Sequence, residues 1–383
     1  MINFMELQQQ YEFDVYPKRE VTIVKGKGAK VWDDKGNEYI DCVAGISVAN
    51  VGHSNDSVVK AITKQAETLI TCPGIFYNDT KAKFLEKLIS ITPKSLTKAF
   101  ICNSGAEAIE AAIKFARYTT KKTEIITAMK GFHGRTYGGM TATAKKEYKE
   151  PFAPLLPGFV HVPYNNFVKL ENAVNENTAA IILELIQGEG GINIAKEDYV
   201  QKVRNLCNEK GILFIVDEIQ TGFCRTGKMF ASEHYNVEPD IMCVAKSMGG
   251  GVPVGATVCS DKIEVPKGKH GSTFGGNPLA CAASIASIDF MIENNLAERS
   301  VELGEYFVNK LKEHDLAKVR EIRNKGLMVG IELKEKVQPY ILKLMEERVL
   351  CLPAGPIVMR LLPPLTIEKE ELDFVVEKLV KVL

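Results

Sequence analysis

Two charged residues in the middle of the chain directly follow short apolar runs. Asp217 follows the run from Ile212 to Val216, and Lys246 follows the run from Ile241 to Ala245. Both runs have the length and the branched side chains of strands that are buried on both faces of a parallel sheet. The carboxyl ends of such strands meet at the edge where open α/β sheets bind ligands. The sequence therefore predicts one acid and one amine facing the same crevice, and the glycines after Lys246 leave room for a ligand.

An amine and a carboxylate would each have a chemical task if a pyridoxal phosphate lay between them. Lys246 would bond covalently to the aldehyde. Asp217 would keep the pyridine nitrogen protonated, so that the ring withdraws electrons from a substrate carbon that loses its proton. The simpler alternative is that Asp217 only ends a strand and Lys246 is solvated, because most charged residues simply face water. These two residues alone leave both interpretations open.

A third apolar run, from Lys98 to Cys102, breaks at a turn of small residues and continues as an alanine-rich helix. A strand, a small-residue turn and a helix start together direct free backbone N–H groups at a phosphate, helped by the helix dipole. The alternative is a simple capping box, with Ser104 as the N-cap and Glu107 three residues later.

Two long segments resemble the cofactor motifs of the class III (ω-amino acid) aminotransferases. They are DEIQTGFCRTG at 217–227 and PDIMCVAKSMGGGVPVGA at 239–256, in the same order as in the family. The resemblance covers essentially the whole chain. It implies pyridoxal 5'-phosphate as the cofactor, with Lys246 and Asp217 as the catalytic residues. The turn NSGAEA at 103–108 resembles the family's phosphate-binding turn, which implies that Ser104, Gly105 and Ala106 bind the phosphate.

The resemblance also implies four further cofactor contacts. Phe132 matches the aromatic residue that stacks on the cofactor ring, and Ile219 would pack on the opposite face of the ring. Gln220 would hydrogen-bond to the ring hydroxyl. Thr273 matches a threonine that reaches the phosphate of the neighbouring subunit's cofactor, so the active sites would be shared between two subunits of a homodimer.

Three residues match the family's substrate-binding positions. Arg135 resembles the arginine that holds a substrate carboxylate, and Arg360 the second carboxylate-binding arginine. Glu189 lies among glycines at a strand end and resembles the carboxylate that pairs with that second arginine. His133 lies between these motifs, but the sequence gives it no partner and therefore no role.

Composition narrows the classes of function. Lysine and arginine number 48, as do aspartate and glutamate, so no overall charge attracts the chain to nucleic acid or to an anionic membrane. Nine cysteines without a CxxC pair fit neither a disulfide framework nor a thiolate metal site. No run is long enough for a signal peptide or a membrane span. We expect a cytoplasmic protein without a metal.

The expected fold class is α/β. The resemblance implies a fold-type I enzyme, with a large domain built on a mainly parallel sheet and a smaller α+β domain. We expect residues 49–284 to form the large cofactor-binding domain, and residues 1–48 and 285–383 to form the small one. Near the start of the chain, a hairpin turn is expected at 34–36. A helix is expected at 55–68, with Val58, Val59 and Leu69 among the apolar residues on one face.

The expected reaction moves a terminal amino group between an α-N-blocked ornithine or lysine and 2-oxoglutarate, in arginine or lysine biosynthesis. The blocking group could be acetyl, succinyl or an acidic amino-group carrier protein, because each leaves the reacting end unchanged. Alternatives with the same scaffold are an ornithine or 4-aminobutyrate aminotransferase and an aminomutase. A non-enzymatic scaffold is a further alternative, which the presence of Lys246, Asp217 and Arg135 disfavours.

Overall fold

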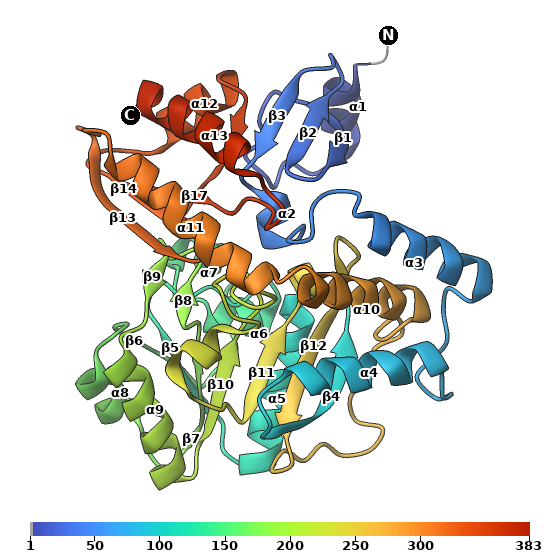
Figure 1. The fold of residues 1–383 in the computed structure, drawn as a ribbon. Helices are drawn as coiled ribbons and strands as arrows, with labels where there is room; N and C mark the ends of the chain where they lie inside the picture. Colours follow the sequence, from blue (N-terminus) through green and yellow to red (C-terminus); the bar gives the residue numbers. More distant parts are fainter. Residues whose placement is uncertain (1–2) are drawn as a thin grey trace.

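A seven-stranded sheet forms the centre of the protein, which a computed structural model describes for residues 3–383 (Figure 1). In spatial order its strands are β4 (Leu96–Cys102), β12 (Gly255–Ser260), β11 (Ile241–Val244), β10 (Leu213–Asp217), β7 (Thr178–Leu183), β5 (Glu124–Ala128) and β6 (Phe159–Val162). β12 runs antiparallel to both of its neighbours, and the other adjacent pairs are parallel. The predicted α/β class with a mainly parallel sheet is confirmed.

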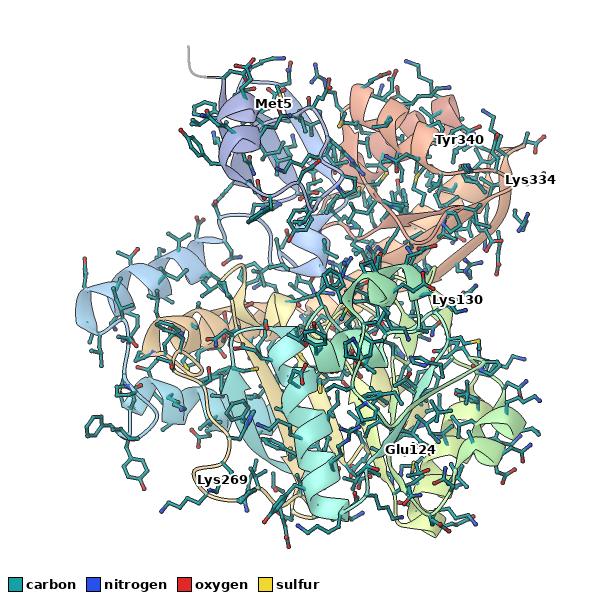
Figure 2. All side chains as sticks on the ribbon, turned by 180° about the vertical axis from the view of Figure 1, so that it is seen from behind. Met5, Glu124, Lys130, Lys269, Lys334 and Tyr340 are labelled. Carbon is teal, nitrogen blue, oxygen red and sulfur yellow. The ribbon has the colours of Figure 1, made fainter. Side chains whose placement is uncertain are left out.

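Helices cover both faces of this sheet. Three of them are α5 (Gly105–Thr120), α8 (Phe167–Ala173) and α9 (Glu197–Lys210). Ile182 and Ile215 pack toward α5 on one face, whereas Ile181 and Phe214 belong to the core beneath α8 and α9 on the other. Figure 2, which shows the back of the view in Figure 1, has α5 in front of the sheet. Burial on both faces explains why the strands are apolar without alternation.

Strands from the two ends of the chain share one small sheet. Its order is β1 (Ile23–Lys27), β2 (Lys30–Asp33), β3 (Glu38–Asp41) and β15 (Val349–Leu350). β2 and β3 are antiparallel around the predicted turn at 34–36, and β15 adds to β3 in parallel. The first and last parts of the chain therefore lie side by side above the large sheet (Figure 1).

The C-terminal part contains a second four-stranded sheet and its helices. The strands are β13 (Val319–Lys325), β14 (Met328–Leu333), β17 (Val358–Leu361) and β16 (Leu352–Pro353), and the helices are α11 (Leu296–Lys312), α12 (Gln338–Glu346) and α13 (Lys369–Val382). Helices and strands are both present in this region, as expected for the smaller α+β domain. The boundary proposed at residue 284 falls inside α10 (Pro278–Glu293), which packs against α3 (Asp56–Thr68) and α4 (Asp79–Ile91).

The remaining elements are short and mostly border the loops above the large sheet. They are α1 (Phe4–Tyr11), α2 (Ala44–Ser47), α6 (Tyr137–Ala142), α7 (Lys146–Lys149), β8 (Ile186–Gln187), β9 (Asn193–Ile194) and the 3₁₀ turns η1 (Glu150–Phe152), η2 (Ala231–Tyr235) and η3 (Lys246–Gly249). Across residues 3–383, none of the helices combines the length and apolar character needed to cross a bilayer.

One face of α3 differs from the sequence prediction. Val58 is buried, but Val59 and Leu69 are 47% and 44% exposed. The segment that follows α3 also presents Ile70, Phe76 and Tyr77 to solvent, with Tyr77 fully exposed. The apolar pattern of α3 is therefore only partly used for packing within one chain.

The short element α2 is a left-handed turn. Its four residues have φ values of 47°, 62°, 66° and 63°, and only the second of them is a glycine. A left-handed conformation costs roughly 1–2 kcal/mol for each residue that carries a Cβ. The surrounding structure must therefore hold Ala44, Ile46 and Ser47 in place.

Candidate active site

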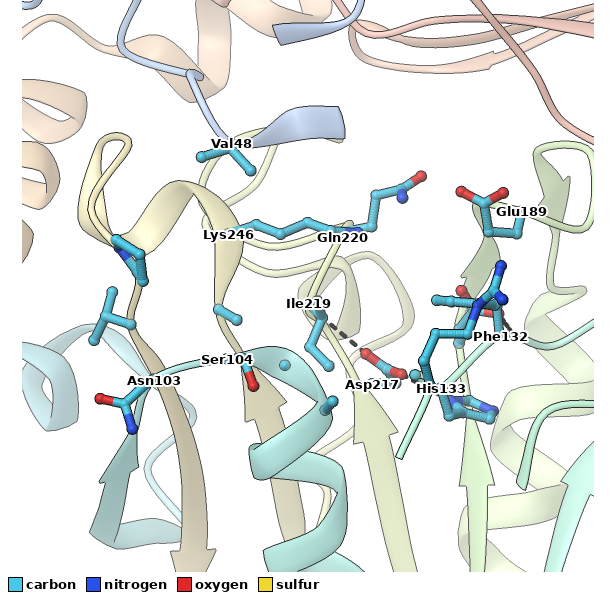
Figure 3. Close-up of a pocket in the computed structure, with 18 of the residues that line it drawn as sticks. Val48, Asn103, Ser104, Phe132, His133, Glu189, Asp217, Ile219, Gln220 and Lys246 are labelled. Carbon is cyan, nitrogen blue, oxygen red and sulfur yellow. Dashed lines mark hydrogen bonds and ion pairs between the residues drawn. The ribbon is translucent and has the colours of Figure 1, made fainter. Parts of the chain in front are cut away.

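A cavity of about 520 Å³ opens at the carboxyl ends of the parallel strands (Figure 3). Of the residues predicted for the site, those that line it are Ser104, Gly105, Ala106, Phe132, Arg135, Glu189, Asp217, Ile219, Gln220 and Lys246. They come from five segments of the chain: the start of α5, the loop after β5, the turn after β8, the end of β10 with the loop that follows it, and the start of a 3₁₀ turn after β11. Arg360 lies directly behind this wall and contacts two of its members. Thr273 is exposed and lies outside the cavity lining.

Lys246 begins η3 two residues after the end of β11 at Val244 and has a left-handed backbone, with φ of 50°. Its half-buried side chain extends across the upper part of the cavity toward Gln220 (Figure 3). Burial, and then the nearby charge of Arg360, lower the pKa of Lys246 from 10.5 to about 8. Roughly a tenth of this amine is therefore neutral, and hence nucleophilic, at pH 7, far more than for an ordinary lysine.

Asp217 is the last residue of β10 and is 4% exposed at the floor of the cavity. Its Oδ1 accepts a hydrogen bond of 3.0 Å from the backbone N–H of Ile219. Its neighbour Glu218 faces away from the cavity, because its carboxylate accepts hydrogen bonds from the backbone N–H groups of Ala231 and Ser232. Of the two acids at this strand end, only Asp217 is available to a ligand.

His133 is the partner of Asp217, and the sequence did not identify this pair. His133 Nδ1 lies 2.7 Å from Asp217 Oδ2, and both side chains are almost completely buried. Burial on its own lowers the pKa of His133, but the hydrogen bond to Asp217 and the charges of Asp217 and Glu184 outweigh it and raise that pKa. The only signal for this pair in the sequence is that a buried carboxylate at a strand end requires a hydrogen-bond partner.

Glu184 is a second site residue that the sequence reasoning missed. It lines the cavity after β7 and accepts hydrogen bonds from the backbone N–H groups of Phe132 and Gly188. Burial, and to a lesser extent the charge of Asp217, raise the pKa of Glu184 to about 7, although the charge of His133 opposes this. The hydrogen bond from the Phe132 N–H to Glu184 fixes the backbone of the loop that carries Phe132.

The N-terminus of α5 points at the cavity. Ser104 is the N-cap and its Oγ accepts from the backbone N–H of Glu107, whose own carboxylate reaches back to the N–H of Asn103. The capping role of Ser104 and a phosphate at this helix start are compatible, because the first backbone N–H groups of a helix have no partner inside the helix. A Cβ on Gly105 would approach Ile219 to 2.8 Å, so a glycine is needed for this close contact.

Arg360 on β17 is 2% exposed and makes two polar contacts at the cavity wall. Its Nη2 lies 2.6 Å from Glu189 Oε1, and its Nη1 donates to Gln220 Oε1 over 3.1 Å. A Cβ on Gly188 would lie 2.1 Å from Gln220 Oε1, so Gly188 makes space for the amide. The contact between Arg360 Nη2 and Glu189 Oε1 is the ion pair that was expected between Glu189 and this arginine.

Arg135 lies at the mouth of the cavity, where its side chain is exposed. Its guanidinium stacks 3.9 Å from the centre of the Tyr148 ring, and within residues 3–383 it forms no ion pair. Phe132 and Ile219 line the cavity below it from two different loops. A planar ligand with a phosphate fits this arrangement, between two apolar side chains and in front of a helix N-terminus.

The parallel α/β sheet, the lysine and aspartate at its strand ends and the phosphate cradle define a pyridoxal phosphate-dependent enzyme of fold type I. The protein belongs to the class-III aminotransferases, because the sequence pattern of that family, aminotransferase class-III, matches residues 14–383. It is therefore an aminotransferase whose cofactor is pyridoxal phosphate.

Three proteins with named activities resemble this chain over nearly its whole length. A [LysW]-aminoadipate semialdehyde transaminase of Deinococcus radiodurans is 46% identical over 99% of this chain and 90% of its own. An acetylornithine aminotransferase of Methanosarcina acetivorans is 47% identical over 98% of this chain and 95% of its own. An ornithine aminotransferase structure from Toxoplasma gondii, with partial occupancy of pyridoxal phosphate at its active site, superposes with a TM-score of 0.95 at 35% identity, covering 99% and 93% of the two chains.

Proposed function

We propose that the enzyme transfers the terminal amino group of an α-N-blocked ornithine or lysine to 2-oxoglutarate, or catalyses the reverse, within arginine or lysine biosynthesis. The single observation that supports this best is the pair of Glu189 with Arg360 beside Arg135, which forms no ion pair with any residue of 3–383. An amino donor of this kind brings an uncharged chain to the reacting end, whereas 2-oxoglutarate brings a carboxylate. One pocket must accept both.

In this proposal the two arginines divide the carboxylates between them. Arg135 holds the distal carboxylate of the donor and later that of 2-oxoglutarate. Arg360 binds the carboxylate beside the reacting carbon, and Glu189 neutralises Arg360 while the donor occupies the site. Without Glu189, a buried guanidinium would be left without a charge partner, which is costly in a partly desolvated site. Glu189 is 31% exposed and adjoins glycines, which supports its moving away.

The proposed catalytic residues act on one substrate carbon. Bound pyridoxal phosphate supplies the electron withdrawal that makes a proton on this carbon acidic. Lys246 would hold the cofactor covalently and, once its amine is released, would move that proton. Asp217 would supply a negative charge to the ring nitrogen, and His133 holds Asp217 in position through the 2.7 Å contact.

The remaining proposed cofactor contacts are those that the family resemblance implies, and the cavity lining supports all of them except Thr273. The helix start at Ser104, Gly105 and Ala106 would bind the phosphate, and Phe132 and Ile219 would pack against the two faces of the ring. Gln220 keeps its amide nitrogen for the ring hydroxyl, because its oxygen accepts from Arg360. Thr273 would complete the phosphate site of a second copy.

A homodimer is part of the proposal. Thr273 is exposed, and so are Phe274 and the apolar segment 69–77, which fits a surface that a second copy covers. The blocking group is proposed from the relatives, one named for LysW and the other for acetylornithine. An acidic amino-group carrier protein is thus a proposed partner, and cytoplasmic biosynthesis the proposed setting.

The test is a comparison of kcat/KM for four amino donors with 2-oxoglutarate. The donors are N-acetylornithine, lysine linked to the carrier protein, free ornithine and 4-aminobutyrate. We expect one of the first two to exceed the last two by at least about tenfold, measured as glutamate formed. A preference for free ornithine or 4-aminobutyrate would contradict the proposed substrate. Rearrangement of a donor without 2-oxoglutarate would instead indicate an aminomutase.

A further inference from the structure

Arg225 is completely buried in the loop that follows Gln220, and it connects three distant parts of the chain. Its Nε donates to Ser47 Oγ over 3.0 Å, and its Nη2 donates to Asn50 Oδ1 over 2.6 Å. Its Nη1 donates to the backbone carbonyls of Leu327 and Pro363, at 3.0 and 2.7 Å. All of these acceptors are uncharged, and within residues 3–383 no carboxylate pairs with this guanidinium.

A buried charge without a counter-charge is costly, and burial lowers the pKa of Arg225. The cost is offset because every contact is a charge-assisted hydrogen bond, which is stronger than a neutral one. A planar guanidinium can reach several acceptors at fixed angles, whereas a lysine cannot. A buried arginine that is held only by uncharged acceptors is therefore expected to have a structural role at this position.

This role concerns the left-handed turn of α2. Two of the four groups that accept hydrogen bonds from Arg225 are close to this turn. Ser47 is its last residue, and Asn50 follows three residues later. Ser47 Oγ also lies 3.4 Å from the carbonyl of Gln220, and Asn50 Nδ2 donates to the carbonyl of Phe223 over 2.8 Å. Arg225 and these contacts therefore join the strained turn to the loop that carries Gln220.

The turn leads directly into the upper wall of the cavity. Val48, directly after the turn, lines the cavity and lies above Lys246 in Figure 3, on the side away from the floor formed by Asp217. Movement of the turn would therefore displace both Val48 and Gln220, although Arg225 itself is not part of the cavity lining.

We propose that Arg225 is a positioning residue that holds the left-handed turn 44–47 and thereby keeps Val48 in the upper wall of the substrate pocket. Without this contact the strained turn relaxes, and only a fraction of molecules has the wall in place. The apparent affinity for substrate falls by that fraction, because binding must first restore the wall. Once substrate has bound, the wall is restored and the chemical step is little changed.

The main test is Ser47→Ala, which removes one acceptor of Arg225 without changing any charge. Its matched control is Ser300→Ala, because the buried Ser300 Oγ donates to the Arg225 carbonyl and accepts from the Leu327 N–H but does not touch the turn. Arg225→Lys is the second variant, since it keeps the charge and loses the fork. Arg225→Ala leaves a large buried void and is less suitable, because it could prevent folding.

Two readouts are needed, and one of them is independent of any substrate. In hydrogen–deuterium exchange of the holoenzyme, Ser47→Ala should speed exchange in residues 44–50, whereas Ser300→Ala should leave this segment unchanged. In steady-state kinetics, Ser47→Ala should raise KM about three- to tenfold with kcat within about twofold, the range expected for one hydrogen bond. Arg225→Lys should change both readouts in the same direction and by more.

Unchanged exchange at 44–50 in Ser47→Ala and Arg225→Lys would overturn the proposal. Faster exchange at 44–50 together with a three- to tenfold loss of kcat and an unchanged KM would also overturn it, because that result places the effect on the chemical step. The inference rests on aminotransferase activity but not on the blocking group, so KM is measured with the best donor of the four compared above. If none of them reacts, the proposed substrate has failed, and the exchange experiment still decides whether Arg225 holds the turn.

Discussion

At the scale of single residues, the environment of Lys246 makes its amine easier to deprotonate. The lowered pKa, about 8, has a measurable consequence for cofactor uptake. Only the neutral amine attacks an aldehyde, so the rate of covalent attachment should rise with pH and reach half of its maximum near pH 8, rather than near 10.5. Mixing apo-protein with pyridoxal phosphate and following the absorbance change over pH 6–11 measures this. A half-maximum above pH 10 would contradict the lowered pKa, and Lys246→Ala is the control without covalent attachment.

The charge of Glu189 should decide which carboxylates Arg360 attracts. We expect Glu189→Ala and Glu189→Gln to gain roughly tenfold or more in the preference for the α-amine of glutamate over the terminal amine of the donor, because either change frees a buried guanidinium. The measurement is the rate of each half-reaction in a single turnover. Glutamine nearly preserves the size of the side chain, so agreement between the two variants assigns the effect to charge. Equal losses for both amines would show that Glu189 is not the switch.

Asp217 should act through its charge and not through its shape. Asp217→Asn retains the size and one acceptor for His133, so we expect the melting temperature to stay within a few degrees while single-turnover rates fall roughly 10²-fold or more. His133→Asn leaves the carboxylate in place and should lose less. Parent-like half-reactions in Asp217→Asn would mean that this residue only ends a strand.

At the scale of elements, the contact between α5 and Ile219 tests the phosphate cradle. Alanine favours helices over glycine by about 1 kcal/mol, so Gly105→Ala should not weaken α5 itself. Its new Cβ would instead meet Ile219 at 2.8 Å and displace it. We expect pyridoxal phosphate to bind roughly tenfold or more weakly, measured by equilibrium dialysis, without a lower melting temperature. In Gly105→Ala/Ile219→Val, which lacks the nearest methyl group, part of the affinity should return; no loss in Gly105→Ala would contradict the cradle.

The strands could be predicted from the sequence because local pattern determines them. Buried parallel strands are continuous apolar runs, so the ends of β10 and β11, and with them Asp217 and Lys246, were placed to within a residue. Contacts that depend on the tertiary structure leave no local pattern. His133 and Asp217 are 84 positions apart and Arg225 and Asn50 are 175 apart, so neither pair could be derived from spacing. The left-handed turn of α2 could not be predicted either, because three of its four residues carry a Cβ and normally avoid that conformation.

At the scale of the whole molecule, the proposed sharing of active sites predicts complementation between two defective variants. If Thr273 serves the neighbouring subunit, a hybrid of Lys246→Ala and Thr273→Ala contains one site with both residues intact. Equal mixing with subunit exchange should then give about a quarter of the parent activity, since half of the dimers are hybrids with one intact site each. Activity no greater than that of Thr273→Ala alone, under conditions where exchange is demonstrated, would place Thr273 in the site of its own chain.

The pairing of β15 with β3 also constrains when the protein can finish folding during synthesis. Arg348, next to β15, hydrogen-bonds to Tyr39 in β3, and these residues are 309 positions apart. At about 5–20 residues per second, a ribosome needs roughly 15–60 s to make the intervening chain. Throughout that time the edge of β3 has no partner from its own chain and is open to pairing with other strands. Synthesis rate and chaperone supply should therefore affect the yield of active enzyme.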